Sequence, residues 1–241
     1  MTTRLELLPD VYLTAVQTSR FKTACFSLSF LRPLRQEEAG MNALLPSVLL
    51  RGSESAPSIR AIADRLDALC GASVGSLVRK KGEIQLTGLF ADGLEDRYAG
   101  EPVFSRLLEL TAELLLRPRT QGGVFVPQIV MQERQKLLDT IESTLDDKAE
   151  YCQTQLLRQM CRGEAYAVGR LGEAGPLAAV DEAALWAHYQ KVLASSRAEL
   201  FYLGSKPAQE VAALLRPLLK DLPRGACVPV STAPGPQPKA L

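Results

Sequence analysis

Two stretches near the start of the chain alternate between apolar and polar residues with a period of about two. The first is Val11 to Thr18. The second is Phe21 to Leu31, which places apolar residues on one side at positions 24, 26, 28 and 30. Alternation among β-branched and aromatic residues is typical of β-strands. The short link Ser19-Arg20 predicts that the two strands form a hairpin.

Helical periodicity dominates much of the remaining chain. A helix is expected over Glu37 to Leu50, bent or interrupted at Pro46, because an interior proline costs a helix about 3 kcal/mol. Ser58 to Leu69 has one apolar stripe at positions 59, 62, 66 and 69 and ends before Gly71. Further helices are expected over Pro102 to Leu116, Pro127 to about Met160 with a break near Asp146-Asp147, Asp181 to Leu193 with Asp181 as N-cap, and Ala208 to Lys220 with an interruption near Pro217.

Three more strands complete the predicted elements. They are Ala72 to Val78, Glu83 to Phe90, with Arg79 to Gly82 as the turn between them, and Glu199 to Gly204. Thr120 to Val126 and Gly163 to Gly172 are expected to be loops. Periodicity alone therefore predicts an α/β or α+β fold with antiparallel hairpins.

The change in composition near the C-terminus divides the chain in two. Residues 1–222 are expected to form one domain, which the length of 241 residues allows. Residues 223–241 contain five prolines and no periodicity, so they are expected to be a linker or tail.

Composition excludes several functional classes. The net charge of +1 gives no argument for binding nucleic acid or an acidic membrane surface. No apolar run approaches the roughly 18 residues of a membrane-spanning helix, and no signal peptide is recognisable, so a cytoplasmic location is expected. The five cysteines lack CxxC spacing and are expected to be buried free thiols, with Cys70 in the core.

The single histidine, His188, limits the chemistry that the chain can perform. A two-histidine zinc site cannot be built from one histidine, and any histidine-dependent triad has to use this residue. A surface or core-edge histidine is the simpler interpretation. Ser47 has no base near it in sequence, and Gly122-Gly123 lacks phosphate-loop spacing.

The stretch from Gly40 to Gly71 carries a family resemblance. Leu49-Leu50 precedes Arg51-Gly52-Ser53, and an amphipathic helix then leads to Cys70-Gly71. In this order the chain resembles the pitrilysin/insulinase-type zinc peptidases, which include the mitochondrial processing peptidases. The resemblance implies an α+β peptidase-type domain, with helices packed on a mixed, mostly antiparallel sheet. It also implies a second homologous domain, which is absent from this chain.

The zinc motif of that family is missing. Counting back from Arg51-Gly52-Ser53, the two histidines of His-X-X-Glu-His fall on Ala43 and Ser47, and the glutamate falls on Pro46. The family pattern of two glutamates on the long helix places the first on Glu133 and the second, a zinc ligand, on Thr140. Zinc is therefore not expected here, and no catalytic residue is assigned.

Two other acids lie close to Thr140 on the same helix. Asp139 and Glu142 point to other sides of the helix, so neither replaces Thr140 as a ligand. Together with Glu133 they are most simply interpreted as a solvated helix face.

The resemblance is strongest to the non-peptidase partners of bacterial two-protein pairs, in which the long helix also runs into an Asp-Asp-Lys-x-x-Tyr segment, here Asp146 to Tyr151. It implies a non-catalytic subunit that joins a zinc-bearing paralogue and helps to enclose an extended peptide. An exposed sheet edge can hold such a peptide through main-chain hydrogen bonds. The candidate edge strand contains Ala72, Val74, Ser76 and Val78.

Two alternatives stay open at this point. The chain is an active zinc metallopeptidase whose ligands are misplaced in this alignment, or it is a structural or assembly subunit that binds a folded partner and no peptide. The single histidine argues against the first alternative.

Overall fold

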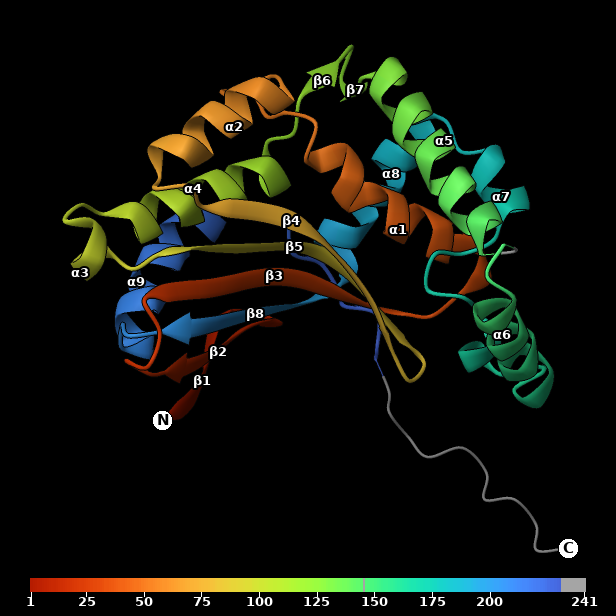
Figure 1. The fold of residues 1–241 in the computed structure, drawn as a ribbon, viewed down its shortest axis with the longest axis horizontal. Helices are drawn as coiled ribbons and strands as arrows, with labels where there is room; N and C mark the ends of the chain where they lie inside the picture. The colour runs from red at the N-terminus through yellow and green to blue at the C-terminus, as the bar shows by residue number, and fades with distance from the viewer. Residues whose placement is uncertain (145, 231–241) are drawn as a thin grey trace, which may run out of the picture.

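A six-stranded sheet forms the centre of the computed structural model, which describes residues 1–144 and 146–230 (Figure 1). The strand order is β1-β2-β8-β3-β5-β4. The strands are β1 (Thr2–Leu8), β2 (Val11–Gln17), β3 (Thr23–Pro33), β4 (Ser73–Lys81), β5 (Ile84–Leu94) and β8 (Arg197–Gly204). Only the β2–β8 pair is parallel, so the predicted mixed, mostly antiparallel sheet is confirmed.

Helices cover one face of the sheet, which makes the described residues an α+β fold, as predicted (Figure 1). α1 and α4 pack on β5, α8 packs on β3, and α9 packs on β1 and β2. The helices are α1 (Gln36–Leu49), α2 (Ile59–Ala68), α3 (Asp96–Ala99), α4 (Val103–Leu116), α5 (Pro127–Ser143), α6 (Lys148–Met160), η1 (Ala165–Ala167), α7 (Ala174–Ala178), α8 (Glu182–Ser195) and α9 (Ala208–Leu219). The other sheet face, called the open face below, carries more exposed side chains, such as Phe201.

The hydrophobic core lies between the sheet and the helices. The alternation in β3 is confirmed, because Ala24, Phe26, Leu28 and Phe30 are all buried. Apolar residues of α4 pack into the same core, and this burial is the main stabilising contribution to such a domain.

The predicted hairpin between residues 11–18 and 21–31 is wrong. β8 lies between β2 and β3 and pairs with both, and Thr18 N donates to Gly204 O as the chain crosses the end of β8. The sequence pattern did not identify β1, which pairs with β2 on the outer side. A local pattern cannot reveal a strand that inserts from far along the chain.

Pro46 lies inside α1 without interrupting it, so of the two predicted outcomes, a bend or an interruption, the interruption is wrong. A proline has no N–H to give to the carbonyl of Asn42 one turn earlier. The hydroxyl of Thr87 on β5 donates to this carbonyl instead, over 2.6 Å. α9 likewise continues through Pro217.

The long predicted helix is split near Asp146-Asp147, as expected. α5 ends at Ser143, and the Asp147 side chain caps α6 by accepting from the backbone of Ala149 and Glu150. The expected loop at residues 120–126 contains a short hairpin of β6 (Thr120–Gln121) and β7 (Val124–Phe125). β4 extends past the expected turn at Arg79 and reaches Lys81.

The cysteine prediction is partly wrong. All five cysteines are free, as predicted, but none is fully buried: Cys70 and Cys152 are exposed, and the other three are half-buried. Cys70 has a φ of 57° at the end of α2, so it forms part of the turn and not of the core.

The first residues of the predicted tail contact the domain. The Arg224 guanidinium donates to the carbonyls of Leu193 and Ser196, and the backbone N–H of Val228 donates to Ser195 O. Residues 231–241 of the predicted tail lie outside the described residues. Among the described helices, none is long and apolar enough to cross a membrane.

Candidate functional site

α1 carries three of the residues that align with the family zinc site. It packs against α5 and against β4 and β5 (Figure 1). Ala43 and Pro46 are buried, and Ser47 is half-buried one turn after Ala43. Thr140 on α5 is exposed, and its hydroxyl donates to Lys136 O over 2.8 Å.

Glu133 on α5 is the acid retained from the family pattern, and it is buried. Its Oε1 lies 3.0 Å from Arg51 Nη1 and 2.8 Å from Lys136 Nζ. Arg51 also donates to Gln132 Oε1, so one guanidinium joins the end of α1 to the start of α5. The Glu133 carboxylate is therefore neutralised by two cations from the protein itself.

The residues at these positions do not fit a catalytic zinc ion. Such a site needs three protein ligands and one open position. Ala43 and Pro46 have no side-chain ligand atom, while Ser47 and Thr140 offer only neutral hydroxyls. Among the described residues, no group of three or more His, Cys, Asp or Glu side chains is arranged to hold a metal ion. The alignment of these positions with the family ligands stays a prediction.

Asp139 and Glu142 do not join Glu133 in a carboxylate cluster. Both are exposed on α5, and Asp139 accepts from Gln135 within the helix. The predicted solvated helix face is therefore confirmed for Asp139 and Glu142 and wrong for Glu133, which is buried and paired with Arg51 and Lys136.

His188 lies in the core, not at the surface or core edge as predicted. It is 5% exposed, and its Nε2 lies 2.7 Å from Asn42 Oδ1. The Asn42 amide donates to Gln85 Oε1, so the ring belongs to a buried chain of polar groups. Burial lowers the pKa of His188 to about 4, which leaves the imidazole neutral at pH 7. The ring joins α8 to α1 through Asn42.

A buried ion pair lies close to this network and was not found from the sequence. Arg32 on β3 donates two hydrogen bonds to Glu38 Oε2, the shorter 2.7 Å long, and Lys191 on α8 lies 2.7 Å from Glu38 Oε1. Burial by itself would raise the pKa of Glu38, but the hydrogen bonds from Lys191 and Arg32 outweigh it and lower the pKa to about 2. At neutral pH the Glu38 carboxylate is therefore charged, and its ion pair with Arg32 joins α1 to β3.

Arg51-Gly52-Ser53, the landmark of the family resemblance, has a structural role at the start of the α2 region. Gly52 has a φ of 156°, and a Cβ there would come within 2.9 Å of the backbone of Pro57. Ser53 Oγ donates to Glu113 Oε1 on α4 over 2.7 Å, and Ser55 donates to the same oxygen. The landmark therefore ties the α1–α2 connection to α4.

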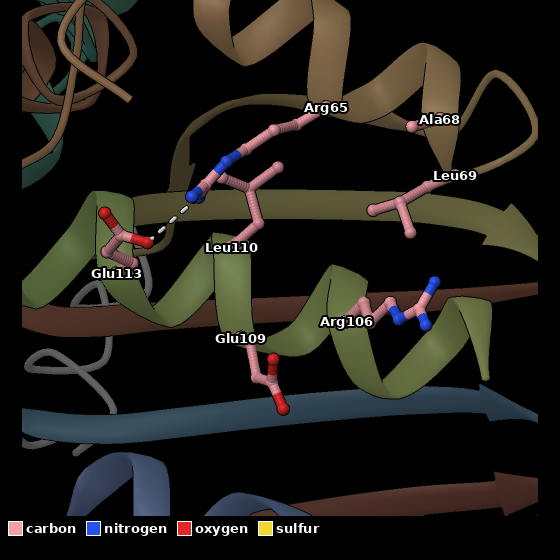
Figure 2. Close-up of a pocket in the computed structure, with 7 residues that line it drawn as sticks. All are labelled: Arg65, Ala68, Leu69, Arg106, Glu109, Leu110 and Glu113. Carbon is pink, nitrogen blue, oxygen red and sulfur yellow. Dashed lines mark hydrogen bonds and ion pairs between the residues drawn. The ribbon is translucent and has the colours of Figure 1, made fainter. Parts of the chain in front are cut away.

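A hollow of about 410 Å³ lies between α2 and α4, beside this carboxylate (Figure 2). Arg65 reaches across it from α2 and forms an ion pair with Glu113 over 3.1 Å. Arg106 and Glu109 on α4 also line the hollow. Burial raises the pKa of Glu113, and the stronger effect of hydrogen bonds from Ser53, Ser55 and Arg65 lowers it to about 2. Glu113 is thus bonded on both oxygens, and it joins α2, α4 and the connection between α1 and α2.

β4 is the outermost strand of the sheet, next to β5, so one side of its backbone is unpaired within the described part of the chain. Three of the four residues proposed for a peptide-binding edge, Val74, Ser76 and Val78, lie on it. Ala72 precedes β4 and is buried in a small cluster with Leu69 and Ala91, so it does not contribute to the edge.

The chain is similar in sequence to a curated protein and in fold to solved structures. The chain is 31% identical over 198 residues to a Bacillus subtilis protein described as "Probable inactive metalloprotease YmfF", covering 81% of this chain and 46% of that protein. No protein-family model matches the chain.

Two solved structures share the fold. A conserved protein from Enterococcus faecalis superposes with a TM-score of 0.86 at 26% identity, covering 96% of this chain and 56% of that one. A peptidase M16 inactive domain from Pseudomonas fluorescens superposes with a TM-score of 0.76 at 17% identity, covering 98% of this chain and 54% of that one. The chain thus spans about half the length of its relatives, and the resemblance to the pitrilysin-type family, numbered M16, is confirmed.

Proposed function

Since this chain has the fold of a pitrilysin-type (M16) peptidase domain and is similar to a probable inactive metalloprotease, we propose that it acts as a non-catalytic peptidase-like subunit. In this proposal it pairs with a zinc-bearing paralogue and helps to hold an extended peptide. It carries no zinc and cleaves no peptide by itself.

The side chains at the aligned zinc positions are the observation that carries the non-catalytic assignment. Ala43 and Pro46 have no side-chain ligand atom or base, and Ser47 and Thr140 have only neutral hydroxyls, whereas a catalytic zinc ion needs three protein ligands. Glu133, the other acid of the family pattern, forms ion pairs with Arg51 and Lys136.

The unpaired edge of β4 supports the peptide-holding role. Extended peptides add to exposed sheet edges through main-chain hydrogen bonds, which tolerate many sequences. β4 offers nine residues for this purpose and runs beside α1, which packs against it. A peptide on this edge would therefore lie next to the helix that aligns with the zinc-bearing helix of active relatives.

Reconstitution with a paralogue that carries His-X-X-Glu-His tests the proposal. We expect the two chains to co-purify and the paralogue to lose peptidase activity when this chain is withheld. Unchanged activity of the paralogue alone would contradict the pairing. EDTA-sensitive cleavage by this chain alone would contradict the non-catalytic assignment and favour an active metallopeptidase.

The structural-subunit alternative gives a different result in the same experiment. Tight binding to a folded partner without binding of any unfolded peptide would overturn the peptide-holding role. The chain would then be a structural subunit that binds a folded partner, and β4 would hold no peptide.

A further inference from the structure

We propose that the β4 edge preferentially binds acidic peptides. In the preferred peptide, every second side chain faces the open face of the sheet: the first two of these are acidic and the next two are apolar. This inference rests on the proposed function, in which β4 holds an extended peptide. It adds the chemical class of that peptide and its register on the strand.

The pairing of β4 with β5 decides which side chains share a face. Directly opposite residues on two antiparallel strands point to the same side of a sheet. Lys80 is opposite the buried Gln85 and faces the helices, so the odd-numbered residues of β4 face the other way. The open face of β4 therefore carries Ser73, Gly75, Leu77, Arg79 and Lys81.

Two cations stand at one end of this row. Arg79 and Lys81 are exposed, and within the described residues neither forms an ion pair or a side-chain hydrogen bond. Lys80 between them is different, because its Nζ donates to Tyr166 O and Val168 O and lies 4.0 Å from the Tyr166 ring centroid. Two of the three neighbouring cations are thus available to a ligand, and both lie on one face.

The other end of the row is apolar. Gly75 is opposite Phe90, and a Cβ on Gly75 would lie 2.4 Å from Phe90 Cε1, so the Phe90 ring extends over the outermost strand toward the edge. A hollow of about 580 Å³ opens on the same face and is lined by Leu77, Arg79 and Phe90 among others. Apolar side chains of an added strand would contact the Phe90 ring and Leu77.

These two ends give a pattern that a peptide can match. Successive side chains of an added strand alternate between the faces, so every second residue meets this row. Two acids opposite Lys81 and Arg79 would be followed, two residues apart, by apolar residues opposite Leu77 and Gly75. The residues between them face the helix side, next to Val74, Ser76, Val78 and Lys80.

Fluorescence anisotropy with labelled peptides tests this proposal. The probe peptide has about nine residues, with Glu at two successive alternate positions, Phe and Val at the next two, and Thr between them. It is made in both chain directions, together with versions in which Gln or Lys replaces Glu. At low salt we expect the Gln version to bind about fivefold more weakly and the Lys version more weakly still, with the difference shrinking at high salt.

Variants of the protein locate the preference. The double variant Arg79→Glu with Lys81→Glu should reverse it, so that the Lys peptide binds better than the Glu peptide. The matched control Arg20→Glu with Lys220→Glu changes the net charge equally at exposed positions far from β4 and should keep the preference for Glu. Circular dichroism checks that each variant folds, and Arg79→Gln with Lys81→Gln replaces the first pair if it does not.

A backbone-methylated peptide separates the failure of this inference from that of the proposed function. Methylating every second amide nitrogen, in both registers, blocks strand addition in one of the two. Loss of binding on methylation, with equal affinity for Glu and Gln peptides, would leave edge binding intact and overturn the acidic preference. If no peptide in the series binds, the peptide-holding function falls and this inference with it.

Basic residues on an edge strand also prevent association between copies of a protein. If that were the whole role of Arg79 and Lys81, the charge-reversed variant would show no reversal of peptide preference. That result would overturn the proposal.

Discussion

His188 and Glu38 lie in neighbouring buried networks that join α1 to α8 and to the sheet, and both make the folded state sensitive to acid. The pKa of His188 is lowered, so the unfolded chain binds a proton more readily than the native ring as pH falls through 6.5. The pKa of Glu38 is also lowered, so its contribution is present above pH 4.5 and is lost as pH falls toward 2. The two residues therefore act in separate pH windows.

The free energy of unfolding should fall by about 2 kcal/mol between pH 7 and pH 5, because the unfolded chain takes up a proton on His188 that the native ring does not bind above about pH 4. The chain has one histidine, so this decrease can be assigned to it. Urea unfolding at the two pH values measures it. In His188→Gln the difference should shrink to a few tenths of a kcal/mol, whatever the stability of the variant at pH 7. An unchanged difference in the variant would show that another group is responsible.

Glu38→Gln should lower the free energy of unfolding at pH 7 by about 3 kcal/mol, because it leaves the buried Arg32 guanidinium without its counter-charge. Glu37→Gln, on the exposed side of the same helix turn, is the matched control and should change it by less than about 0.5 kcal/mol. Chemical denaturation of both variants gives the comparison. Equal stabilities for the two would contradict the role of the ion pair.

For single residues, the sequence allowed candidate positions to be named by alignment with the family, but it could not predict which residues their side chains contact. Arg51 was recognised as a landmark, yet its pairing with Glu133 depends on how α1 packs against α5. His188 was expected at or near the surface because a polar residue on a helix usually lies there. Its partner Asn42 lies far away in sequence, so no local pattern could identify it.

α1 contains a proline and receives a hydrogen bond from outside the helix at the carbonyl that the proline leaves without a donor. Pro46 deprives the Asn42 carbonyl of its helix donor, and Thr87 on β5 supplies one instead. This hydrogen bond is one of several in the core that join α1 to the sheet. α1 is therefore continuous from Gln36 to Leu49 in spite of the proline.

Thr87→Val should lower the free energy of unfolding by about 2 kcal/mol, because the buried Asn42 carbonyl then has no donor. In a Pro46→Ala background the new N–H can bond to that carbonyl, so the same substitution should cost about 1 kcal/mol less. A double-mutant cycle by urea denaturation measures the coupling. Thr111→Val is the control, because the Thr111 hydroxyl donates to a carbonyl of its own helix. Additive effects of Pro46→Ala and Thr87→Val would contradict the account.

Elements were predictable from periodicity where their contacts are local. Asp181 was placed correctly at the N-cap of α8, where it accepts from Ala184 N, and the break between α5 and α6 was found. The predicted hairpin of β2 and β3 is wrong because β8 lies between these two strands, and β8 is about 180 residues away from them in sequence. Which side of β4 is unpaired also follows only from that order.

The described residues have a peptidase-type fold, and the positions that the predicted alignment matches to the zinc site hold Ala43, Pro46, Ser47 and Thr140. The fold class was predicted through the family resemblance, whereas periodicity alone left α/β and α+β both open. β4 lies beside α1, so the proposed peptide site adjoins the helix that carries three of the predicted zinc positions.

The zinc content of the purified chain, measured by elemental analysis after mild dialysis, tests the central claim most directly. The account predicts far less than one zinc per chain, because Ala43, Ser47 and Thr140 offer no effective ligands and Glu133 is paired with Arg51 and Lys136. Thermal unfolding should accordingly be unchanged by EDTA. One tightly held zinc per chain would contradict the account and would require a site built around other residues.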